Sequence, residues 1–429
     1  MKRLALVVTI VAGCDALLGM EPNPAFCAAH PGEAQCPDAS HDAAPEPDTA
    51  SGCTSDATCA SPLPVCELST ATCVQCTSGE PLACTAATPV CGADDQCRGC
   101  ASHGECASRA CLPDGSCGSD ANVAYVDPAG TDNAACTFAL PCKKVAQALA
   151  TRRAFVKLTA TTAEQVTIAD QDVSLLADAG ARLEAATPGV ILTITGASQV
   201  AIYDLAIANG LGSTGVGIAM PTGNTATLAL HRAALANNAG GGLVASGGTV
   251  TIERTTISLN AGGGVALSST AFDLENDMIV LNGAPGSLVG GIALQSVATT
   301  GNHRIEFSTI ADNAGAATVH SGISCGTVTS PIAFANNIIY GNAVSGGGHQ
   351  IGGSANCTTR YSDIGPDAAP GTGNLDADPA FASAAQHDYH LAATSPCKDA
   401  ADPAATLDID IDGDHRPRGP ARDMGADEQ

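Results

Sequence analysis

The sequence predicts an all-β protein whose main part is a solenoid of short stacked strands, preceded by a small disulfide-rich module and a disordered tether. Three observations carry this prediction: an apolar pattern that recurs at shifts of 22 residues and then, with loop insertions, at 31 and 29; twelve cysteines in three sets of four; and a stretch rich in Pro, Ala and acidic residues before them. The chain has 429 residues, which is long enough for one sizeable core beside smaller parts.

The first residues have the order of a secretory signal peptide. Lys2 and Arg3 precede the apolar run from Leu4 to Ile10, and small residues then lead to Cys14. This run is shorter than the roughly 20 apolar residues that span a bilayer. We therefore expect residues 1–13 to be a signal peptide that exports the chain.

The letters VAGC at residues 11–14 resemble the lipobox of bacterial lipoproteins, whose cysteine becomes the acylated first residue of the mature protein. The resemblance implies that Cys14 is lipidated and that the membrane, at the outer surface of the cell envelope, is a partner. The alternative is an ordinary cleaved signal with a coincidental cysteine. Residues 14–52, as in PDASHDAAPEPDTASG, show no apolar period and are predicted to be a lipid-anchored tether, in which Cys27 and Cys36 could close a small loop.

Residues 53–118 form a cysteine-rich module. With almost no aliphatic residues it cannot bury an apolar core, so we expect six disulfides whose connectivity stays open. Zinc is the alternative, because Cys73 with Cys76 and Cys97 with Cys100 are CxxC pairs. The module resembles the cysteine-rich repeats between anchor and main domain in surface proteins of predatory and soil bacteria, which implies a stalk or partner-binding role. The sets are Cys53, Cys59, Cys66, Cys73; Cys76, Cys84, Cys91, Cys97; and Cys100, Cys106, Cys111, Cys117.

Beyond residue 122 the chain carries an extended start, a Cys136 and Cys142 pair, a helical run over residues 143–150 and then repeats. One repeat cannot bury its apolar face alone, so the repeats must stack, with an Asn ladder at one turn and glycines at sharp corners. In the template, Val250, Ile252, Ile257 and Asn260 match Leu228, Leu230, Leu235 and Asn238 upstream and Phe272, Leu274, Ile279 and Asn282 downstream.

Residues 123–429 resemble the right-handed parallel β-helix, or pectate-lyase-like, superfamily. The end of the chain, with NLDADPAF and DIDGDHRPRGPARDMGADE, is similar to the closing segment of bacterial surface β-helix proteins. The superfamily includes polysaccharide lyases, glycoside hydrolases, epimerases and adhesins, so the resemblance implies an architecture more than an activity. Cys325 occupies an inward position and Cys357 lies about one coil later, so we predict that they pair and leave Cys397 unpaired.

The alignment also predicts an outward column of side chains. In enzymes of this superfamily such a face binds an extended polysaccharide, and the resemblance implies Glu253, Glu275 and Asp277 as acids, with Arg232 or Arg254 as base. A paired-acid hydrolase is a further alternative, and the simplest interpretation is a solvated strand face. The column holds Tyr203, His231, Glu253, Glu275 and Glu306, beside Asp204, Arg232, Arg254, Asn276 and Phe307.

The letters LDIDIDGDH, with Asp408, Asp410 and Asp412, resemble the first half of a calcium loop, although Gly419 stands where an EF-hand has Glu. Calcium is therefore a candidate cofactor here, and a structural end cap is the favoured alternative. His387, His390 and His415 fit no closed metal site by their spacing, so we expect them to be surface residues.

The net charge of −25 argues against nucleic acid as a partner, because phosphates would be repelled. The sequence contains no GxSxG, HExxH or P-loop motif. We therefore expect a non-catalytic β-helix that binds extracellular polysaccharide or another envelope protein, or has a structural role. The alternative is a polysaccharide lyase or glycoside hydrolase that acts in a groove along the β-helix.

Overall fold

The computed structural model describes residues 52–79, 83–85, 87–316, 320–329, 331–344, 350–366 and 370–429. They fall into two compact units, one of residues up to Cys84 with Cys91–Cys97, the other of Thr85–Val90 with Arg98–Gln429. The predicted signal peptide, Cys14, Cys27, Cys36 and the tether lie outside the described residues. Within the described ranges no helix is long and apolar enough to cross a membrane.

The cysteine sets follow one rule of pairing. In each set the first cysteine bonds the third and the second bonds the fourth, as in Cys53–Cys66 and Cys59–Cys73. The members of each CxxC pair belong to different disulfides, so no thiolate of these sets is available to zinc. Short elements lie between the bonds: η1 (Asp56–Thr58), β1 (Val65–Glu67), β2 (Thr72–Val74), β3 (Val90–Cys91), β4 (Cys97–Arg98) and η3 (His103–Glu105).

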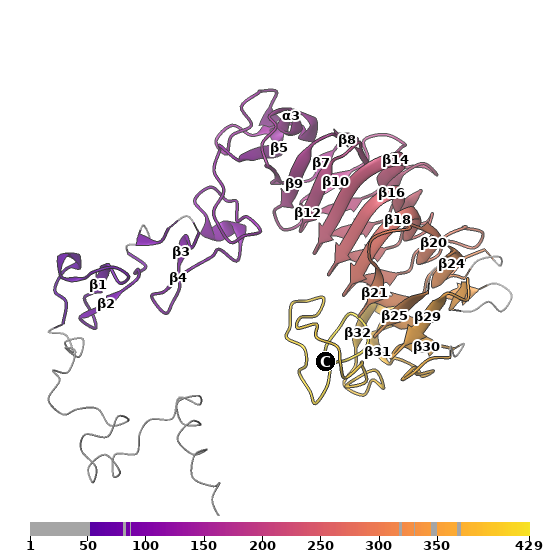
Figure 1. The fold of residues 1–429 in the computed structure, drawn as a ribbon. Coiled ribbons are helices and arrows are strands. Elements are labelled where there is room, and N and C mark those ends of the chain that lie inside the picture. Colours follow the sequence, from indigo (N-terminus) through magenta and orange to yellow (C-terminus); the bar gives the residue numbers. More distant parts are fainter. Residues whose placement is uncertain are drawn as a thin grey trace, which may run out of the picture. The chain divides into compact units, whose positions relative to one another are not determined.

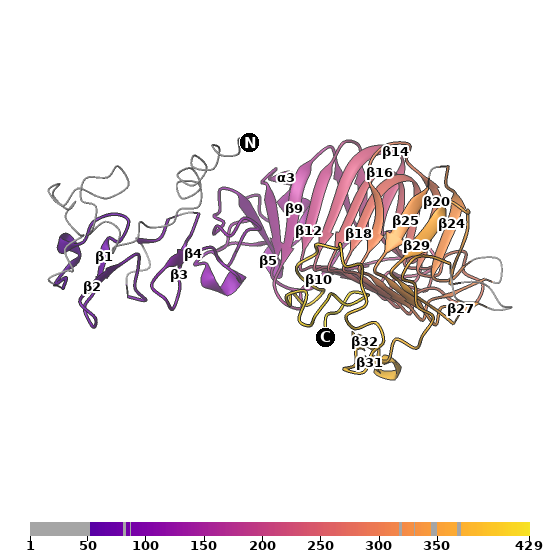
Figure 2. The same ribbon diagram turned by 60° about the horizontal axis from the view of Figure 1, so that its bottom comes forward.

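The larger unit is a right-handed parallel β-helix, which confirms the predicted all-β class (Figures 1 and 2). One face is a parallel sheet of nine short strands, one from each coil. Its strands are β7 (Thr162–Ala163), β10 (Arg182–Glu184), β13 (Ala206–Ala208), β15 (Ala234–Ala236), β17 (Thr256–Ser258), β19 (Met278–Val280), β22 (Thr309–Ala311), β26 (Ile338–Tyr340) and β30 (Asp363–Gly365).

The other faces belong to one parallel sheet of fifteen strands, in which long strands such as β14 bend at a register shift and so cover two faces. Its strands are β5 (Val123–Thr131), β6 (Phe155–Leu158), β8 (Val166–Ala169), β9 (Asp172–Ala177), β11 (Leu192–Thr195), β12 (Gln199–Tyr203), β14 (Val216–His231), β16 (Gly241–Glu253), β18 (Val265–Glu275), β20 (Ile292–Val297), β21 (His303–Glu306), β24 (Ile323–Thr327), β25 (Ile332–Ala335), β28 (Ile351–Gly353) and β29 (Cys357–Arg360).

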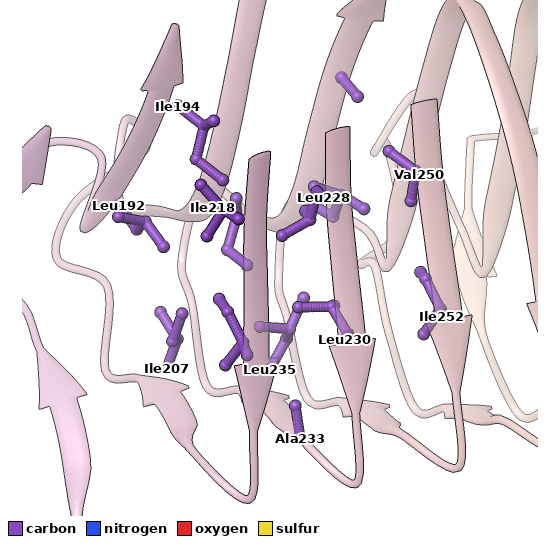
Figure 3. Packing of buried hydrophobic residues seen from close by; sticks show 14 of the residues in the cluster. Leu192, Ile194, Ile207, Ile218, Leu228, Leu230, Ala233, Leu235, Val250 and Ile252 are labelled. Carbon is purple, nitrogen blue, oxygen red and sulfur yellow. The ribbon is translucent and has the colours of Figure 1, made fainter. Parts of the chain in front are cut away.

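The core lies inside the coils. Because side chains alternate along a strand, Leu228 and Leu230 point inward from β14, and Val250 and Ile252 repeat them one coil later (Figure 3). Glycine is required where coils approach at a corner: a Cβ on Gly242 would lie 2.6 Å from the carbonyl oxygen of Gly264. The sheet pairing and the apolar filling therefore come from the same repeat.

Two buried ladders of polar side chains run along the axis. In the first, each Asn side-chain oxygen accepts the backbone N–H of its counterpart one coil earlier, as Asn282 does for Asn260 at 3.2 Å. Its Asn members are Asn238, Asn260, Asn282, Asn313 and Asn342, and Gln350 ends the ladder, because its Oε1 accepts the N–H of Asn342. The second runs along a different turn, through Thr255, Asp277, Ser308, Asn337 and Ser362. These bonds satisfy backbone donors that the turns remove from the sheets.

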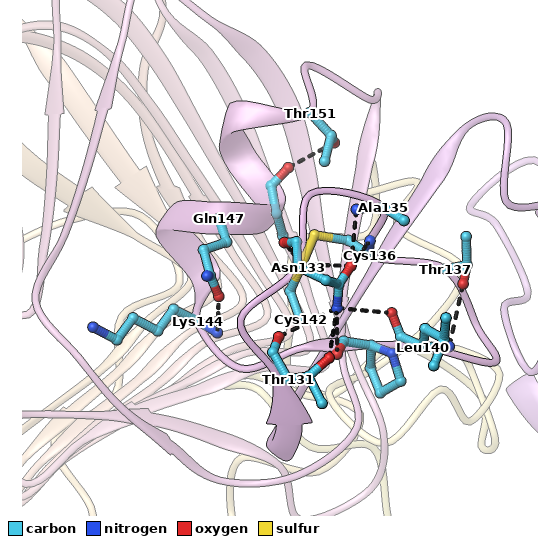
Figure 4. Close-up of a disulfide and its surroundings, with 12 residues drawn as sticks. Thr131, Asn133, Ala135, Cys136, Thr137, Leu140, Cys142, Lys144, Gln147 and Thr151 are labelled. Carbon is cyan, nitrogen blue, oxygen red and sulfur yellow. Dashed lines mark hydrogen bonds between the residues drawn. A yellow bond between two sulfur atoms is a disulfide. The ribbon is translucent and has the colours of Figure 1, made fainter.

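The N-terminal end of the solenoid is covered by α3 (Val145–Ala150), which buries Val145, Ala148 and Leu149. The Cys136–Cys142 disulfide closes the loop before this helix. Just before that loop, Asn133 Oδ1 accepts the N–H groups of Ala135 and Cys136, and its Nδ2 donates to backbone carbonyls (Figure 4). The third cysteine set packs on the outside of the same end, where Leu112 joins a cluster with Val123, Tyr125 and Leu176.

The closing segment, residues 374–429, follows the last coil and includes β31 (Phe381–Ser383), η4 (Ala384–Gln386) and β32 (Asp388–Leu391). It turns back along the β-helix: Arg416 forms a fully buried ion pair with Glu428 and lies over the ring of Phe307, 4.9 Å from its centre.

A disulfide joins Cys325 to Cys357, and the thiol of Cys397 is free and buried. The pair β23 (Ala314–Gly315) and β27 (Ala343–Val344) lies at an insertion loop.

Candidate functional site

The outward column is a line of side chains that occupy one register position in successive coils. Tyr203 pairs with His231, His231 with Glu253, Glu253 with Glu275 and Glu275 with Glu306, after which come Ala335 and Arg360. Each ends a strand whose neighbouring residues point inward. Each is followed by a residue with positive φ, from Asp204 to Tyr361, so every coil turns the same corner here.

The middle of the column lines a hollow of about 570 Å³, which we call the groove. Its floor is formed by side chains of β16, β18, β21 and β29, and its wall is the part of the closing segment from Asp402 to Ile409. Glu253, Glu275, Glu306, Arg304 and Arg360 present charged groups to it. Three acids in register and two guanidinium groups thus share one surface between coils and cap.

Arg304 organises the acids of the groove, and sequence reasoning missed it. Its Nε donates to Asp273 Oδ1 at 2.8 Å, and its Nη2 donates to Asp273 Oδ2 at 2.9 Å. The same Nη2 lies 2.8 Å from Glu275 Oε2, and Nη1 lies 3.7 Å from Glu306 Oε2. The signal was present in the alignment, because Arg304 and Asp273 occupy one register position in adjacent coils, two residues before Glu306 and Glu275 of the predicted column.

The acids of the groove differ in proton affinity. Partial burial raises the pKa of Glu275 and of Glu306, and the guanidinium of Arg304 opposes both shifts. The pKa of Glu253 is instead lowered, chiefly by its hydrogen bond with His231, whose Nδ1 lies 3.0 Å from Glu253 Oε2. Neighbouring carboxylates in one line are therefore tuned in opposite directions.

Both arginines that the resemblance implies as the base, Arg232 and Arg254, form hydrogen bonds with other residues of the protein. Arg232 forms a bidentate pair with Asp204, with distances of 2.7 and 2.9 Å. Arg254 donates from Nε to the carbonyl oxygen of Ile411 at 3.2 Å, underneath the closing segment. Neither Arg232 nor Arg254 lines the groove. Arg360, which does, is ion-paired with Asp402.

Asp277 does not line the groove, contrary to the expectation from the resemblance. Its side chain is fully buried because it is a member of the second ladder, where its Oδ1 accepts the N–H of Thr255 at 2.9 Å. Its Oδ2 has no hydrogen-bond partner among the described residues. Burial raises the pKa of Asp277 well above its usual value.

A second hollow, of about 780 Å³, lies at the other end of the column. The third cysteine set forms one side with His103 and Asp114, and the first coils form the other with Tyr203, Asp204 and Arg232. His103 links the two sides, since its Nε2 lies 3.1 Å from the carbonyl oxygen of Ala177. The rings of Tyr203 and His231 stack 4.7 Å apart, between this hollow and Glu253.

The proposed calcium ligands do not converge. Asp408 pairs with Arg422, and Asp410 accepts the backbone N–H groups of Asp412, Asp414 and Glu428. The third acid, Asp412, points to His390. Asp408 to Asp412 therefore do not form the ligand set of a calcium loop, and Asp410 organises the end cap.

No family model and no curated protein matches the chain. Among solved structures, the chain is similar to the pectate lyase Pel9A, at 17% identity over 72% of this chain and 96% of that one, with a TM-score of 0.47. A pectin methylesterase from Aspergillus niger aligns at 15% identity over 60% and 87% with a TM-score of 0.38, and PemA from Erwinia chrysanthemi at 14% over 62% and 94% with 0.37.

Proposed function

We propose that this protein is an exported, lipid-anchored surface protein whose β-helix binds an extended, hydroxyl-rich polysaccharide along the outward column without cleaving it. One observation carries the proposal: polar side chains stand one per coil in strict register from Tyr203 to Glu306, and members of this column line both hollows. Coils repeat at about 4.8 Å, close to the length of one sugar unit in an extended chain.

The chemistry of the groove supports a neutral chain. Carboxylates accept hydrogen bonds from sugar hydroxyls and guanidinium groups donate to them, and both kinds line the groove. A polyanionic chain would meet Glu253, Glu275 and Glu306 in a protein of net charge −25, and would be repelled unless a cation bridged them. We expect the bound polymer to be uncharged for this reason.

The ion pairs of the arginines support binding without lyase chemistry. A lyase needs a base that can take a proton beside the sugar ring, whereas Arg304 is held by Asp273 and Glu275, and Arg360 by Asp402. Arg254 is directed into the closing segment.

One observation favours a second candidate function, a glycoside hydrolase. Glu253 and Glu275 are register neighbours whose pKa values shift in opposite directions, lowered and raised respectively. Two carboxyl groups whose pKa values are shifted apart are the pair that retaining hydrolases use, at a separation of about 5–5.5 Å.

Binding is tested by calorimetric titration of the full chain with neutral β-glucan and galactomannan oligosaccharides, and with polygalacturonate as the charged comparison. The proposal expects a neutral oligosaccharide to bind and polygalacturonate without calcium to fail. Glu275→Gln should weaken binding about tenfold, the effect of losing one charge-assisted hydrogen bond. Glu184→Gln, an acid on the nine-stranded sheet away from the groove, is the matched control and should bind as the wild type does. Equal affinity of both variants would refute the groove as the binding site.

Catalysis is tested on the same oligosaccharides by following new reducing ends. The binding proposal expects none after prolonged incubation. Turnover that Glu253→Gln and Glu275→Gln both abolish, while Glu184→Gln retains it, would instead establish the hydrolase.

The anchor is a separate part of the proposal, and it rests on the sequence alone. In the native host, full-length protein should partition with membranes, and Cys14→Ser should release it into the soluble fraction. A Cys14→Ser variant that remains in the membrane fraction would refute the lipid anchor. Cross-linking on intact cells tests whether the ligand of the groove is another envelope protein instead of a polysaccharide. If the ligand is a polysaccharide, Glu275→Gln should leave the set of cross-linked proteins unchanged.

A further inference from the structure

Three separate parts of the closing segment bring metal-ligating atoms together beside β32. His390 comes from β32 itself, Asp412 from the loop between Ile409 and His415, and Asp427 from the last residues of the chain. One ligand atom of each lies within 4.8 Å of the other two. None of the three lines the groove, so this cluster is a separate site from the one of the proposed function.

The imidazole of His390 is oriented as it is in many metal sites. Its Nδ1 lies 2.6 Å from Asp388 Oδ1, and that oxygen also accepts the backbone N–H of His390 at 3.2 Å. A carboxylate on one ring nitrogen fixes the proton there and directs the lone pair of the other nitrogen to the metal. That other nitrogen, Nε2, faces Asp412 Oδ2 at 3.1 Å.

The two carboxylates are held in place by contacts outside the cluster. Asp412 stands in a loop whose backbone N–H groups bind Asp410, with distances of 2.9 Å for Asp412 and 2.8 Å for Asp414. Asp427 is buried, and its Oδ2 accepts the N–H of Leu391 at 2.7 Å. The three ligands are thus prepositioned, while the exposed Asp412 leaves the cluster open to solvent.

The local charge is unbalanced in the structure. Three carboxylates, from Asp388, Asp412 and Asp427, surround a single imidazole. Two arginines of the closing segment have other acid partners: Arg416 pairs with Glu428, and Arg418 with Asp414. A third arginine, Arg254, has its guanidinium beside Gly413 and donates from Nε to the carbonyl oxygen of Ile411, and this one positive charge does not balance the three carboxylates. Even a fully protonated His390 would leave an excess of negative charge, which a divalent cation would neutralise.

We propose that His390, Asp412 and Asp427 bind a divalent transition-metal ion of the zinc type, with water completing its coordination and Asp388 orienting the imidazole. One nitrogen and two carboxylate ligands suit zinc, whereas calcium and magnesium prefer all-oxygen sites. The ion ties β32, the loop of Asp412 and the C-terminus together, and so stabilises the closing segment that walls the groove.

The test is calorimetric titration of the full chain, without an affinity tag and after treatment with chelator, using zinc sulfate alone and calcium chloride alone. Zinc should bind at one site and calcium should not compete with it. His390→Ala should abolish this binding, Asp412→Asn should weaken it at least tenfold, and Asp388→Asn should weaken it about 10- to 100-fold through the imidazole. The matched controls are His387→Ala, a neighbouring histidine, and Asp414→Asn, an acid of the same loop, and both should bind zinc as the wild type does.

Cobalt(II) gives an independent readout, because a site with one imidazole and open water positions changes its visible absorption on binding. The absorption should appear in the wild type and in Asp414→Asn, and be absent from His390→Ala. Asp412→Asn changes an exposed side chain and should leave the circular dichroism spectrum intact, so loss of binding there is not loss of fold. Wild-type protein that takes up no zinc at millimolar concentration, or zinc binding equal in His390→Ala and wild type, would overturn the proposal.

Discussion

Arg304 and Glu275 come from adjacent coils and meet at 2.8 Å between Nη2 and Oε2, so this guanidinium of the groove is shared between coils. The same guanidinium also holds Asp273, and it lies near Glu306. Two carboxyl groups with raised pKa values therefore depend on one arginine. The charge state of the groove is set by a residue that the repeat alignment did not single out.

Replacing that arginine tests the relationship. In Arg304→Met, the pKa values of Glu275 and Glu306 should rise further, since the guanidinium lowers both while burial raises them. A carboxyl whose pKa is raised in the folded state stabilises the fold most below its unfolded pKa, and this stabilisation is lost as pH rises through the folded pKa. The variant should therefore lose stability more steeply than the wild type as pH rises above the unfolded pKa of a glutamate, about 4.3.

Carboxyl carbon shifts in a pH titration measure the pKa values directly, and urea unfolding at several pH values measures the stability. Arg182→Met is the matched control, because Arg182 is an exposed arginine on the nine-stranded sheet with only a distant acid partner, Glu184 at 3.8 Å. An unchanged titration of Glu275 in Arg304→Met would contradict the prediction.

Asp277→Asn should stabilise the protein at neutral pH. The Oδ2 of this buried carboxyl group has no hydrogen-bond partner among the described residues. Because the pKa of Asp277 is raised in the folded state, the free energy of unfolding decreases as pH rises from the unfolded pKa toward the folded pKa. In the same ladder an asparagine, Asn337, has partners for both of its side-chain polar atoms. Its Oδ1 accepts the N–H of Ser308, and its Nδ2 donates to the carbonyl oxygen of Ile305. The Nδ2 of an asparagine at position 277 would find the corresponding acceptor in the carbonyl oxygen of Ile252, because Ile252 is the register equivalent of Ile305.

We expect a gain of about 1–3 kcal/mol in the free energy of unfolding at pH 7, the usual cost of one unsatisfied buried polar group. The gain should shrink as pH falls below the folded pKa, because the wild-type carboxyl is then protonated. Chemical denaturation at pH 4 and pH 7 measures both values. A variant that is less stable than wild type at pH 7 would show that the ionised carboxylate has a partner in solution.

The coiled repeat could be predicted from the sequence because the same residues determine both strand pairing and core packing. Val250 and Ile252 recur at a fixed interval, and their inward positions force Glu253 outward, so both the coil and the column follow from one pattern. The interval also placed Cys325 in an inward position, where the structure joins it to Cys357.

The chemistry of the site did not follow, because it depends on contacts between residues far apart in the chain. Arg254 was an available base in the alignment, yet Ile411 lies 157 residues later and accepts its hydrogen bond. The alignment also could not show that Glu275 and Asp277 have different environments. They are two residues apart across a turn, but Glu275 faces the groove whereas Asp277 belongs to a buried ladder.

Asn282→Ala should destabilise the β-helix far more than an alanine at a surface asparagine does. Asn282 Oδ1 accepts both the backbone N–H and the Nδ2 of Asn260, so the change leaves two buried donors of Asn260 without that acceptor. At about 1–3 kcal/mol for each unsatisfied group, the loss should be at least about 2 kcal/mol. Asn209→Ala is the control, since Asn209 also stands at a coil corner but bonds the partly exposed Glu184. Equal losses in the two variants, measured by urea denaturation, would mean that the ladder contributes no more than a surface contact.

The disulfides of the first and third cysteine sets should differ in what they stabilise, although their connectivity is the same. In the third set, Cys106–Cys117 holds the chain around Leu112, which packs with Val123 of β5 and Leu176 of β9. Replacing both cysteines of this bond by Ser should loosen that packing and increase amide exchange in β5 and β9. The matching double change at Cys59 and Cys73 should leave exchange in these strands unchanged, because that bond closes within the other unit. Equal protection of β5 and β9 in both variants would show that the third set does not stabilise the β-helix, and increased exchange in both would show that the two units are energetically coupled.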